Sequence, residues 1–336
     1  MFVSLVMAPI RRLQQQTLLL LTLLLGGVSL AEAADEAIEL LEKMAQAVHQ
    51  LSYVGTFVYQ QGDSLQTMRI VRSVSEEGEY ERLVAMSGQT REVIRARDRV
   101  TCILPEDSSI VVEQANTPRP FTAIPIERLA FLGNYYEFVL GEHERVAGMK
   151  ARQIHIVPRD RYRYGQRLWV AETSHLPLRS EVVDEQGNII EMLIFTSLEV
   201  RDSIPADMLQ PTVGEHDQIF ELAHQEPSRR AARRSPPGWE SIDLPPGFRQ
   251  KVQRRHFLPN KFSQVEHHVY SDGLASVSVF IEQQDQEEQP LVGASRIGGV
   301  NIYGHLHNGH AITVLGEVPG VTVRQIAESM VQVSPP

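Results

Sequence analysis

Apolar and polar residues alternate with a period of two along most of this chain, and this period limits the folds that the chain can adopt. The alternation runs from Tyr53 to Val200 in short stretches separated by turn-forming pairs such as Gly62-Asp63. Because most stretches have no helix between them, neighbouring strands are expected to pair antiparallel. A sheet of about eleven strands must curve strongly or form a partial barrel. The expected strands are Tyr53–Gln60, Leu65–Ser75, Tyr80–Met86, Arg91–Ala96, Arg99–Leu104, Ser109–Glu113, Glu137–Val146, Lys150–Val157, Gln166–Glu172, Leu178–Asp184 and Ile189–Val200.

Two helical segments accompany the predicted sheet. Apolar residues such as Leu41, Met44 and Val48 recur at three- and four-residue spacing, which predicts an amphipathic helix from Asp35 to about Leu51. A second, proline-flanked segment at 125–132 interrupts the series of strands.

Apolar and aromatic residues gather in and after the second helical segment. One interpretation is that they line an apolar ligand cavity inside the curved sheet, which makes them candidate lipid contacts. The other is that the helix fills the open side of the sheet and completes its core, and the sequence does not separate the two. The candidates are Ile124, Leu129, Phe131, Leu132, Tyr135, Tyr136 and Phe138.

The N-terminus carries the three parts of an export signal. Arg11 and Arg12 precede a short apolar run, and Ala31-Glu32-Ala33 supplies a small-x-small exit. The apolar run is about ten residues long, well below the roughly 20 that a membrane-spanning helix needs. We therefore expect residues 1–33 to be removed and the mature protein, which begins with Ala34 rather than a lipid-carrying cysteine, to be soluble outside the cytoplasm.

The stretch 211–237 breaks the strand pattern and is interpreted as a linker between two domains, 34–210 and 238–336. It is polar, basic and interrupted by prolines. Its arginines, in an otherwise acidic chain, are candidates for contacting phosphate groups or an acidic partner. A solvated linker is the alternative. The arginines are Arg229, Arg230, Arg233 and Arg234.

The second domain is expected to be a small α+β module. Asp272-Gly273 and Asn308-Gly309 are each typical of a two-residue hairpin turn. The final helix is expected from about Val323 to Val331, with Thr322 as its N-cap. The expected strands are Phe248–Phe257, Gln264–Ser271, Leu274–Gln283, Asn301–His307 and His310–Glu317.

Three histidines surround the Asn308-Gly309 turn. A two-residue turn places His307 opposite His310, and His305 lies two residues earlier on the same face. Three imidazoles on one face could hold zinc or copper. The alternative is an exposed hairpin tip without metal, because no carboxylate or cysteine completes the site, and no metal is expected.

Motifs of catalysis are absent from the sequence. There is no glycine-rich phosphate loop, no Gly-x-Ser-x-Gly elbow and no His-Glu-x-x-His. No catalytic residue and no cofactor is expected, which favours a binding protein over an enzyme. The formal net charge of −10 argues against general nucleic-acid binding, which needs a basic surface.

Short motifs along essentially the whole mature chain are similar to those of the MucB/RseB family of periplasmic regulators of envelope-stress sigma factors, nearest to the branch tied to alginate control. Each motif alone is mostly strand and turn chemistry, and it is their order that is specific. The motifs are Ser52-Tyr-Val-Gly-Thr-Phe-Val-Tyr59, Arg91-Glu-Val93, Tyr135-Tyr-Glu-Phe138, Tyr164-Gly-Gln-Arg-Leu-Trp-Val-Ala171, Leu176-Pro-Leu-Arg179, Asp184-Glu-Gln-Gly187, Leu244-Pro-Pro-Gly-Phe248, Tyr270-Ser-Asp-Gly-Leu274 and Gly316-Glu-Val-Pro319.

The resemblance implies a mostly antiparallel α+β protein, with a LolA/LolB-like half-barrel whose concave side is closed by helices and with a smaller C-terminal domain. It implies a periplasmic protein that binds the periplasmic part of a membrane-spanning anti-sigma factor and shields it from regulated proteolysis. Lipid or lipopolysaccharide is implied as the signal that relieves binding. A periplasmic lipid or lipoprotein carrier that uses the concave sheet is the alternative, and a homo-oligomer is left open.

Overall fold

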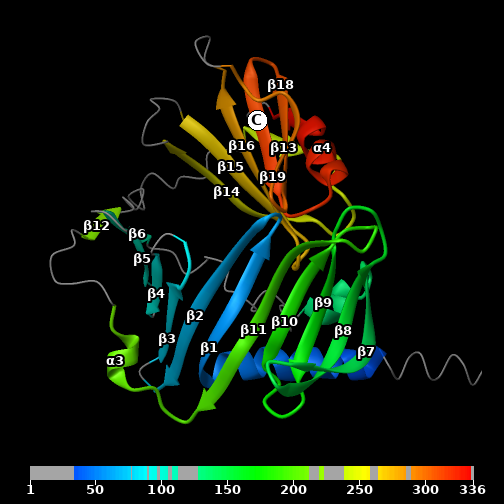
Figure 1. Ribbon diagram of the computed structural model, residues 1–336. Coiled ribbons are helices and arrows are strands. Elements are labelled where there is room, and N and C mark those ends of the chain that lie inside the picture. The colour runs from blue at the N-terminus through cyan, green and yellow to red at the C-terminus, as the bar shows by residue number, and fades with distance from the viewer. Residues whose placement is uncertain are drawn as a thin grey trace, which may run out of the picture.

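The computed structural model describes residues 34–76, 78–88, 91–96, 99–104, 108–112, 128–211, 219–222, 238–257, 264–284 and 289–333. A large curved sheet and a smaller sheet lie end to end, and the upper ends of several large-sheet strands meet the base of the small sheet (Figure 1). The mostly antiparallel fold predicted from the sequence, with a strongly curved sheet and a small α+β module, is confirmed.

The large sheet has twelve strands in the order β12-β6-β5-β4-β3-β2-β1-β11-β10-β9-β8-β7. Only the pairing of β12 with β6 is parallel among these strands. Strand β12 comes from within the stretch 211–237, so part of the segment interpreted as a linker extends this sheet. The strands are β1 (Ser52–Gln61), β2 (Ser64–Ser75), β3 (Gly78–Ala85), β4 (Glu92–Ala96), β5 (Arg99–Leu104), β6 (Ser108–Val112), β7 (Tyr136–Val146), β8 (Met149–Pro158), β9 (Gly165–Ala171), β10 (Pro177–Val183), β11 (Ile189–Arg201) and β12 (Ile219–Leu222).

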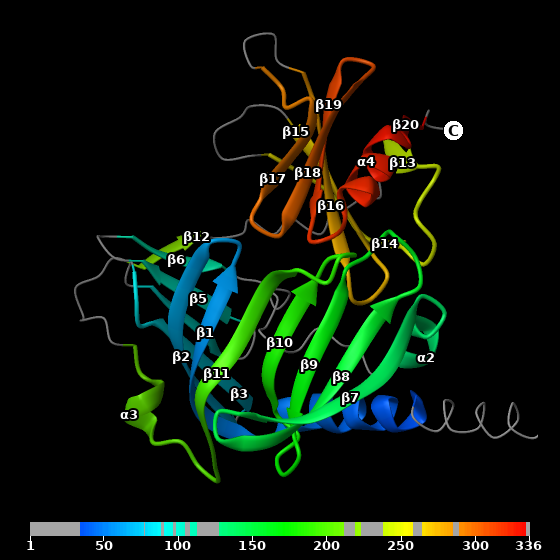
Figure 2. The same ribbon diagram turned by 45° about the vertical axis from the view of Figure 1, so that its right-hand side comes forward.

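A helix at 34–50 crosses the strands of the large sheet on its concave side (Figure 2). Its first half buries Leu41 and Met44 against a cluster that includes Tyr136 and the short helix α2 (Leu129–Leu132). Its second half buries Val48 in a second cluster with strands β1, β2 and β3. The three- and four-residue spacing of its apolar side chains therefore serves two neighbouring parts of one concave core.

The smaller domain has a six-stranded sheet in the order β14-β15-β16-β19-β18-β17 and a two-stranded sheet of β13 and β20. Helix α4 (Gly320–Glu328) buries Val323, Ile326 and Ala327 in one core with these strands. The strands are β13 (Trp239–Ser241), β14 (Arg249–Phe257), β15 (Gln264–Ser271), β16 (Ser276–Gln283), β17 (Gly293–Ile297), β18 (Val300–His307), β19 (His310–Gly316) and β20 (Met330–Gln332). The large domain also has a short helix, α3 (Ala206–Leu209).

Two local predictions in the smaller domain are wrong. Helix α4 begins at Gly320 after Pro319 and ends at Glu328, because Met330–Gln332 leaves the helix to pair with β13. Thr322 is therefore inside the helix and not its N-cap. Asp272-Gly273 is not a two-residue turn, since Ser271 pairs with Ser276 and four residues connect the strands.

The other predicted hairpin is confirmed. His307 pairs with His310 across Asn308 and Gly309, whose φ angles of 49° and 71° are those that a type I′ turn requires. Among the described residues, no helix combines the length and apolar character needed to cross a membrane.

Candidate functional site

The two domains meet at a buried carboxylate, Asp272, in the loop between β15 and β16. Its Oδ2 accepts a hydrogen bond from Tyr136 Oη at 2.9 Å and lies 3.2 Å from Arg163 Nη1, and both partners belong to the large domain. Its Oδ1 accepts the backbone N–H groups of Leu274 and Ala275 at 2.9 and 2.8 Å. One side chain thus shapes its own loop and joins that loop to the other domain.

Arg163 is the cationic partner at this junction and is 1% exposed. Its Nη2 donates to the carbonyl of Pro246 at 2.5 Å, and its Nε lies 3.3 Å from Asp160. The guanidinium also stacks near the rings of Tyr135, Tyr136 and Phe248, with Cζ 4.9, 5.3 and 5.3 Å from the ring centroids. Such contacts strengthen when the cation is removed from water. Because Pro246 and Phe248 belong to the smaller domain and Tyr135 to the large one, Arg163 is bound by both domains.

The phenol of Tyr136 remains a donor in this environment. Burial, followed by the negative charge of Asp272, raises the pKa of Tyr136 far above its ordinary value. Tyr136 is therefore protonated at any physiological pH and donates to the Asp272 carboxylate.

The backbone at Gly247 approaches the ring of Tyr135 closely. A Cβ at this position would lie 2.7 Å from Tyr135 Cε2, and the φ angle of 85° is one that side chains other than glycine rarely adopt. Two smaller contacts extend the junction: Asn301 Nδ2 donates to Tyr164 Oη at 2.8 Å, and Thr322 Oγ1 donates to the carbonyl of Tyr162 at 2.7 Å.

A second contact between the domains lies where the β17–β18 turn approaches the turns of the large sheet. A Cβ on Gly299 would lie 3.0 Å from Ile190 Cγ2, so the backbone of Gly299 lies close to the Ile190 side chain. Here Glu191 of β11 interacts electrostatically with Glu317 of the smaller domain and lies beside Tyr59. Burial, together with the Glu317 carboxylate, raises the pKa of Glu191 to about 7.

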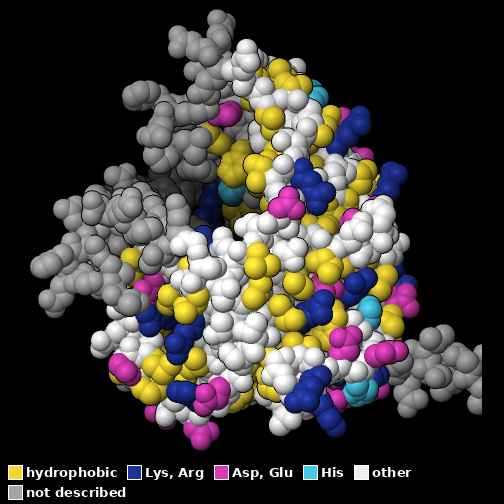
Figure 3. All heavy atoms as spheres, in the orientation of Figure 1, with side chains coloured by type: hydrophobic (Ala, Val, Ile, Leu, Met, Phe, Trp, Pro, Cys, Tyr) yellow, Lys and Arg dark blue, Asp and Glu magenta, His cyan; other side chains and the backbone are white. Residues whose placement is uncertain are grey.

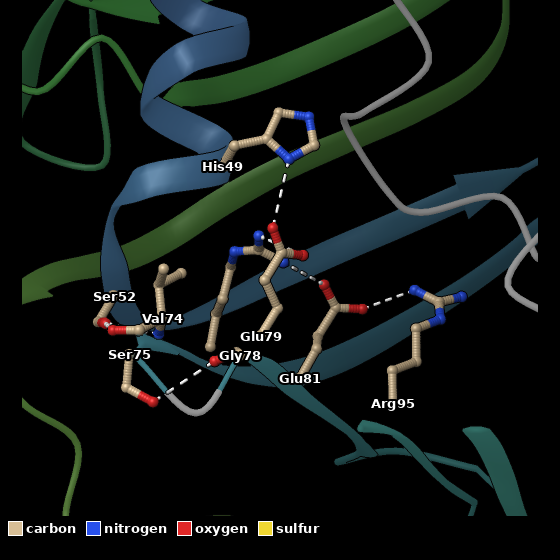
Figure 4. Close-up of polar contacts among 9 residues, drawn as sticks. His49, Ser52, Val74, Ser75, Gly78, Glu79, Glu81 and Arg95 are labelled. Atoms are coloured by element: carbon tan, nitrogen blue, oxygen red, sulfur yellow. Dashed lines mark hydrogen bonds and ion pairs between the residues drawn. The ribbon is translucent and has the colours of Figure 1, made fainter. Parts of the chain in front are cut away.

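A network of charges, buried at Arg72 and Glu81, reaches the end of the 34–50 helix through the exposed His49 (Figure 4). Arg72 lies 3.1 Å from Glu79 and 3.5 Å from Glu81, and Arg95 Nη1 donates to Glu81 at 2.6 Å. His49 Nδ1 lies 3.5 Å from Glu79. Because the arginines and glutamates alternate, the arrangement is that of a structural network of ion pairs.

Each of the two domains is similar to a domain of known proteins. The MucB/RseB N-terminal domain model matches residues 36–213, and the MucB/RseB C-terminal domain model matches residues 233–331. This chain belongs to the MucB/RseB family. The sigma factor AlgU regulatory protein MucB of Pseudomonas aeruginosa is 32% identical over 94% of this chain and 96% of its own length. The sigma-E factor regulatory protein RseB of Haemophilus influenzae is 26% identical over 94% of this chain and 96% of its own length.

A solved structure of the family extends the similarity to three dimensions. The crystal structure of MucB in complex with MucA(peri) superposes with a TM-score of 0.70 at 29% sequence identity. The superposition covers 89% of this chain and 100% of the MucB chain in that structure. Both domains of this MucB/RseB-family chain therefore have their counterparts in that structure.

The residues proposed as lipid contacts separate into two groups in this MucB/RseB-family chain. Leu129, Leu132, Tyr136 and Phe138 are buried in the core against the 34–50 helix. Phe131 lies at the junction, 5.3 Å from Tyr135 between ring centroids, while Tyr135 and Tyr136 contact both the junction and this core. Ile124 lies outside the described residues, and lipid binding by this set stays a prediction.

The other candidates of the sequence analysis have mixed outcomes. His307 and His310 pack around Trp239, with ring centroids 5.8 and 5.1 Å from it, and His305 is 6.1 Å from His307. No group of three or more candidate ligands that could hold a metal occurs among the described residues. Arg229, Arg230, Arg233 and Arg234 lie outside them, so their proposed contacts remain predictions.

Sequence reasoning missed Arg163 and interpreted Asp272 only as a turn residue. A signal was present in Arg159-Asp-Arg-Tyr-Arg-Tyr164, where arginine and tyrosine alternate densely outside any expected strand. Such a run is unusual in a solvated loop, because arginine and tyrosine favour interfaces. The run did not indicate which residue of the smaller domain would contact Arg163.

Proposed function

We propose that this chain is a periplasmic regulator that binds the periplasmic part of a membrane-spanning anti-sigma factor and shields it from regulated proteolysis. The observation that carries the proposal is the similarity, over both domains, to MucB in its complex with MucA(peri). The relatives are named as regulatory proteins, which supports a binding role without catalysis.

The physical basis of the proposed shielding is steric. A protease must take an extended segment into its active site, and a segment held on a sheet edge or in a groove cannot enter it. Main-chain pairing would supply affinity and side-chain pockets would supply selectivity. The free energy that holds the segment is then the free energy that a protease must overcome.

Release by lipid or lipopolysaccharide belongs to the same proposal. A lipid that prefers the unbound form would lower the affinity for the anti-sigma factor by the ratio of its own two affinities. The reciprocal must also hold, so bound anti-sigma factor would weaken lipid binding by the same factor.

The test is protection of the anti-sigma factor's periplasmic fragment from a site-specific protease. We expect the mature chain from Ala34, isolated from the periplasm without detergent, to slow cleavage of the fragment. Added lipopolysaccharide should restore the cleavage rate. Cleavage at the same rate with and without the chain would exclude the proposed function.

The carrier alternative is less well supported by the packing. A carrier needs an apolar space for acyl chains, but the concave face is covered by the 34–50 helix, whose Leu41 is fully buried and whose Met44 and Val48 are each 2% exposed. Lipid bound with high affinity by a chain that gives no protection would favour the carrier.

A further inference from the structure

The junction between the domains gathers positive charges that it does not neutralise. Arg128 precedes α2 in the large domain, whereas Arg249 and Lys251 begin β14 in the smaller one. The Cζ atoms of Arg128 and Arg249 lie 5.9 and 5.0 Å from the centroid of the Phe131 ring. Desolvation, followed by the charges of Arg128 and Arg249, lowers the pKa of Lys251, so both arginines act electrostatically on Lys251.

No carboxylate in the described part of the chain forms an ion pair with any of these three cations. The carboxylate of Asp272 acts electrostatically on Lys251, but it already binds Arg163 and Tyr136. Like charges held together raise the free energy of the folded chain, and an incoming anion would lower it. A basic cluster is also unusual in a chain whose formal net charge is −10.

Strand β14 adds a second feature to this cluster, an open backbone edge. Within the described ranges of the chain, it is the outermost strand of the six-stranded sheet and pairs only with β15. Lys251 is the extra residue of a bulge between Gln250 and Val252, and the residues that follow return to regular pairing. In the space-filling view, Lys and Arg side chains occupy a hollow between the domains at the position of β14 (Figure 3).

We propose that Arg128, Arg249, Lys251 and the free edge of β14 form the docking surface for an acidic, extended segment of the anti-sigma factor. This inference rests on the proposed function and names its contact surface. Carboxylates of the segment would pair with the three cations, and its main chain would pair with β14 beyond the bulge. A phosphate group alone would use the cations and leave the strand edge without a partner, so the surface fits a polypeptide better than a headgroup.

Basic residues and a bulge on an outer strand also discourage pairing between copies of a chain. Protection of the β14 edge against such pairing would require no cation from the large domain. Arg128 nevertheless comes from the large domain and shares the Phe131 ring with Arg249. The convergence of cations from two domains is explained by a ligand that contacts both.

The first experiment measures binding of the anti-sigma factor's periplasmic fragment by fluorescence anisotropy. The variant carries Arg249→Gln and Lys251→Gln, both exposed positions where folding should persist, and circular dichroism checks this. We expect affinity to fall on the order of tenfold and its dependence on salt to weaken. The matched control carries Arg145→Gln and Lys150→Gln, an exposed cross-strand pair at the far end of β7, and should bind like the wild type.

Further measurements separate the outcomes. Hydrogen exchange of the β14 backbone should slow when the fragment binds. Equal affinity of the wild type and the Arg249/Lys251 variant, or unchanged exchange in β14, would overturn the docking surface alone. Failure of the wild type to bind would overturn both proposals. Phosphatidylglycerol vesicles that bind the wild type but not the variant, with unchanged fragment affinity, would assign the cations to a lipid headgroup and overturn the peptide assignment.

Discussion

The two ends of the interface between the domains carry opposite arrangements of charge. At one end, buried Arg163 and buried Asp272 lie 3.2 Å apart and attract each other. At the other end, the carboxyl groups of Glu191 and Glu317 meet beside Tyr59 and repel each other when both are ionised. The first end therefore holds the domains together by attraction, whereas the second is weakened when the glutamate pair loses its proton.

This difference shows how one interface can resist separation at one end and change its stability with protonation at the other. A buried pair of opposite charges resists separation, because either partner alone would be left as an unpaired charge in a dry environment. A pair of like charges stores repulsion that protonation or a nearby cation removes. Relative movement of the domains should begin at Glu191 and Glu317 and leave the Asp272 end in contact.

The largest effect is expected from Asp272→Ala, which leaves Arg163 buried and removes the acceptor of Tyr136. We expect the free energy of unfolding to fall by about 3–5 kcal/mol, measured by urea denaturation. The control is Asp160→Ala, which removes the partly exposed acidic partner of the same Arg163 and should cost about 0–1 kcal/mol. Equal losses in the two variants would show that burial does not distinguish these partners.

An intermediate effect is expected from Gly247→Ala at the Asp272 end. The new Cβ meets the Tyr135 ring, and the backbone has a positive φ, so we expect a loss of about 2–3 kcal/mol in thermal unfolding. Gly148→Ala is the matched control, because its φ is 79° but nothing lies within 4 Å of the added Cβ. The free energy of unfolding of the Gly148→Ala variant should fall by only about 1–2 kcal/mol. Identical losses would show that the ring of Tyr135 moves aside without cost.

The smallest effect concerns pH at the Glu191 end. The pKa of Glu191 rises from 4.5 to about 7 in the folded protein, so the folded state binds the proton more tightly. The contact is fully stable below pH 4.5 and weakens as pH rises through about 7. We expect a loss of about 1 kcal/mol between pH 5.5 and 8, since water around the exposed Glu317 screens the repulsion. Glu191→Gln should remove this pH dependence in urea denaturation, and an unchanged profile would assign it to other groups.

Local patterns predicted most of the large sheet and failed where pairing is not local. The eleven alternating stretches correspond to β1 to β11 because each strand needs only its own period and a turn. Strand β12 pairs with β6, which is distant in the sequence, and β17 has the weakly patterned sequence Gly293-Ala-Ser-Arg-Ile297. Neither strand carries a local signal strong enough to indicate it.

The sequence by itself determined eleven strands of the large sheet, the Asn308-Gly309 turn, the amphipathic 34–50 helix and the family, because each depends on neighbouring residues or on ordered motifs. It also placed an aromatic segment at 131–138, part of which lies at the junction. Only the tertiary structure decided that Asp272 meets Arg163 and Tyr136, and that Arg128 joins Arg249 and Lys251. These contacts join residues from different domains, and their energies depend on distance and burial, which no local pattern contains.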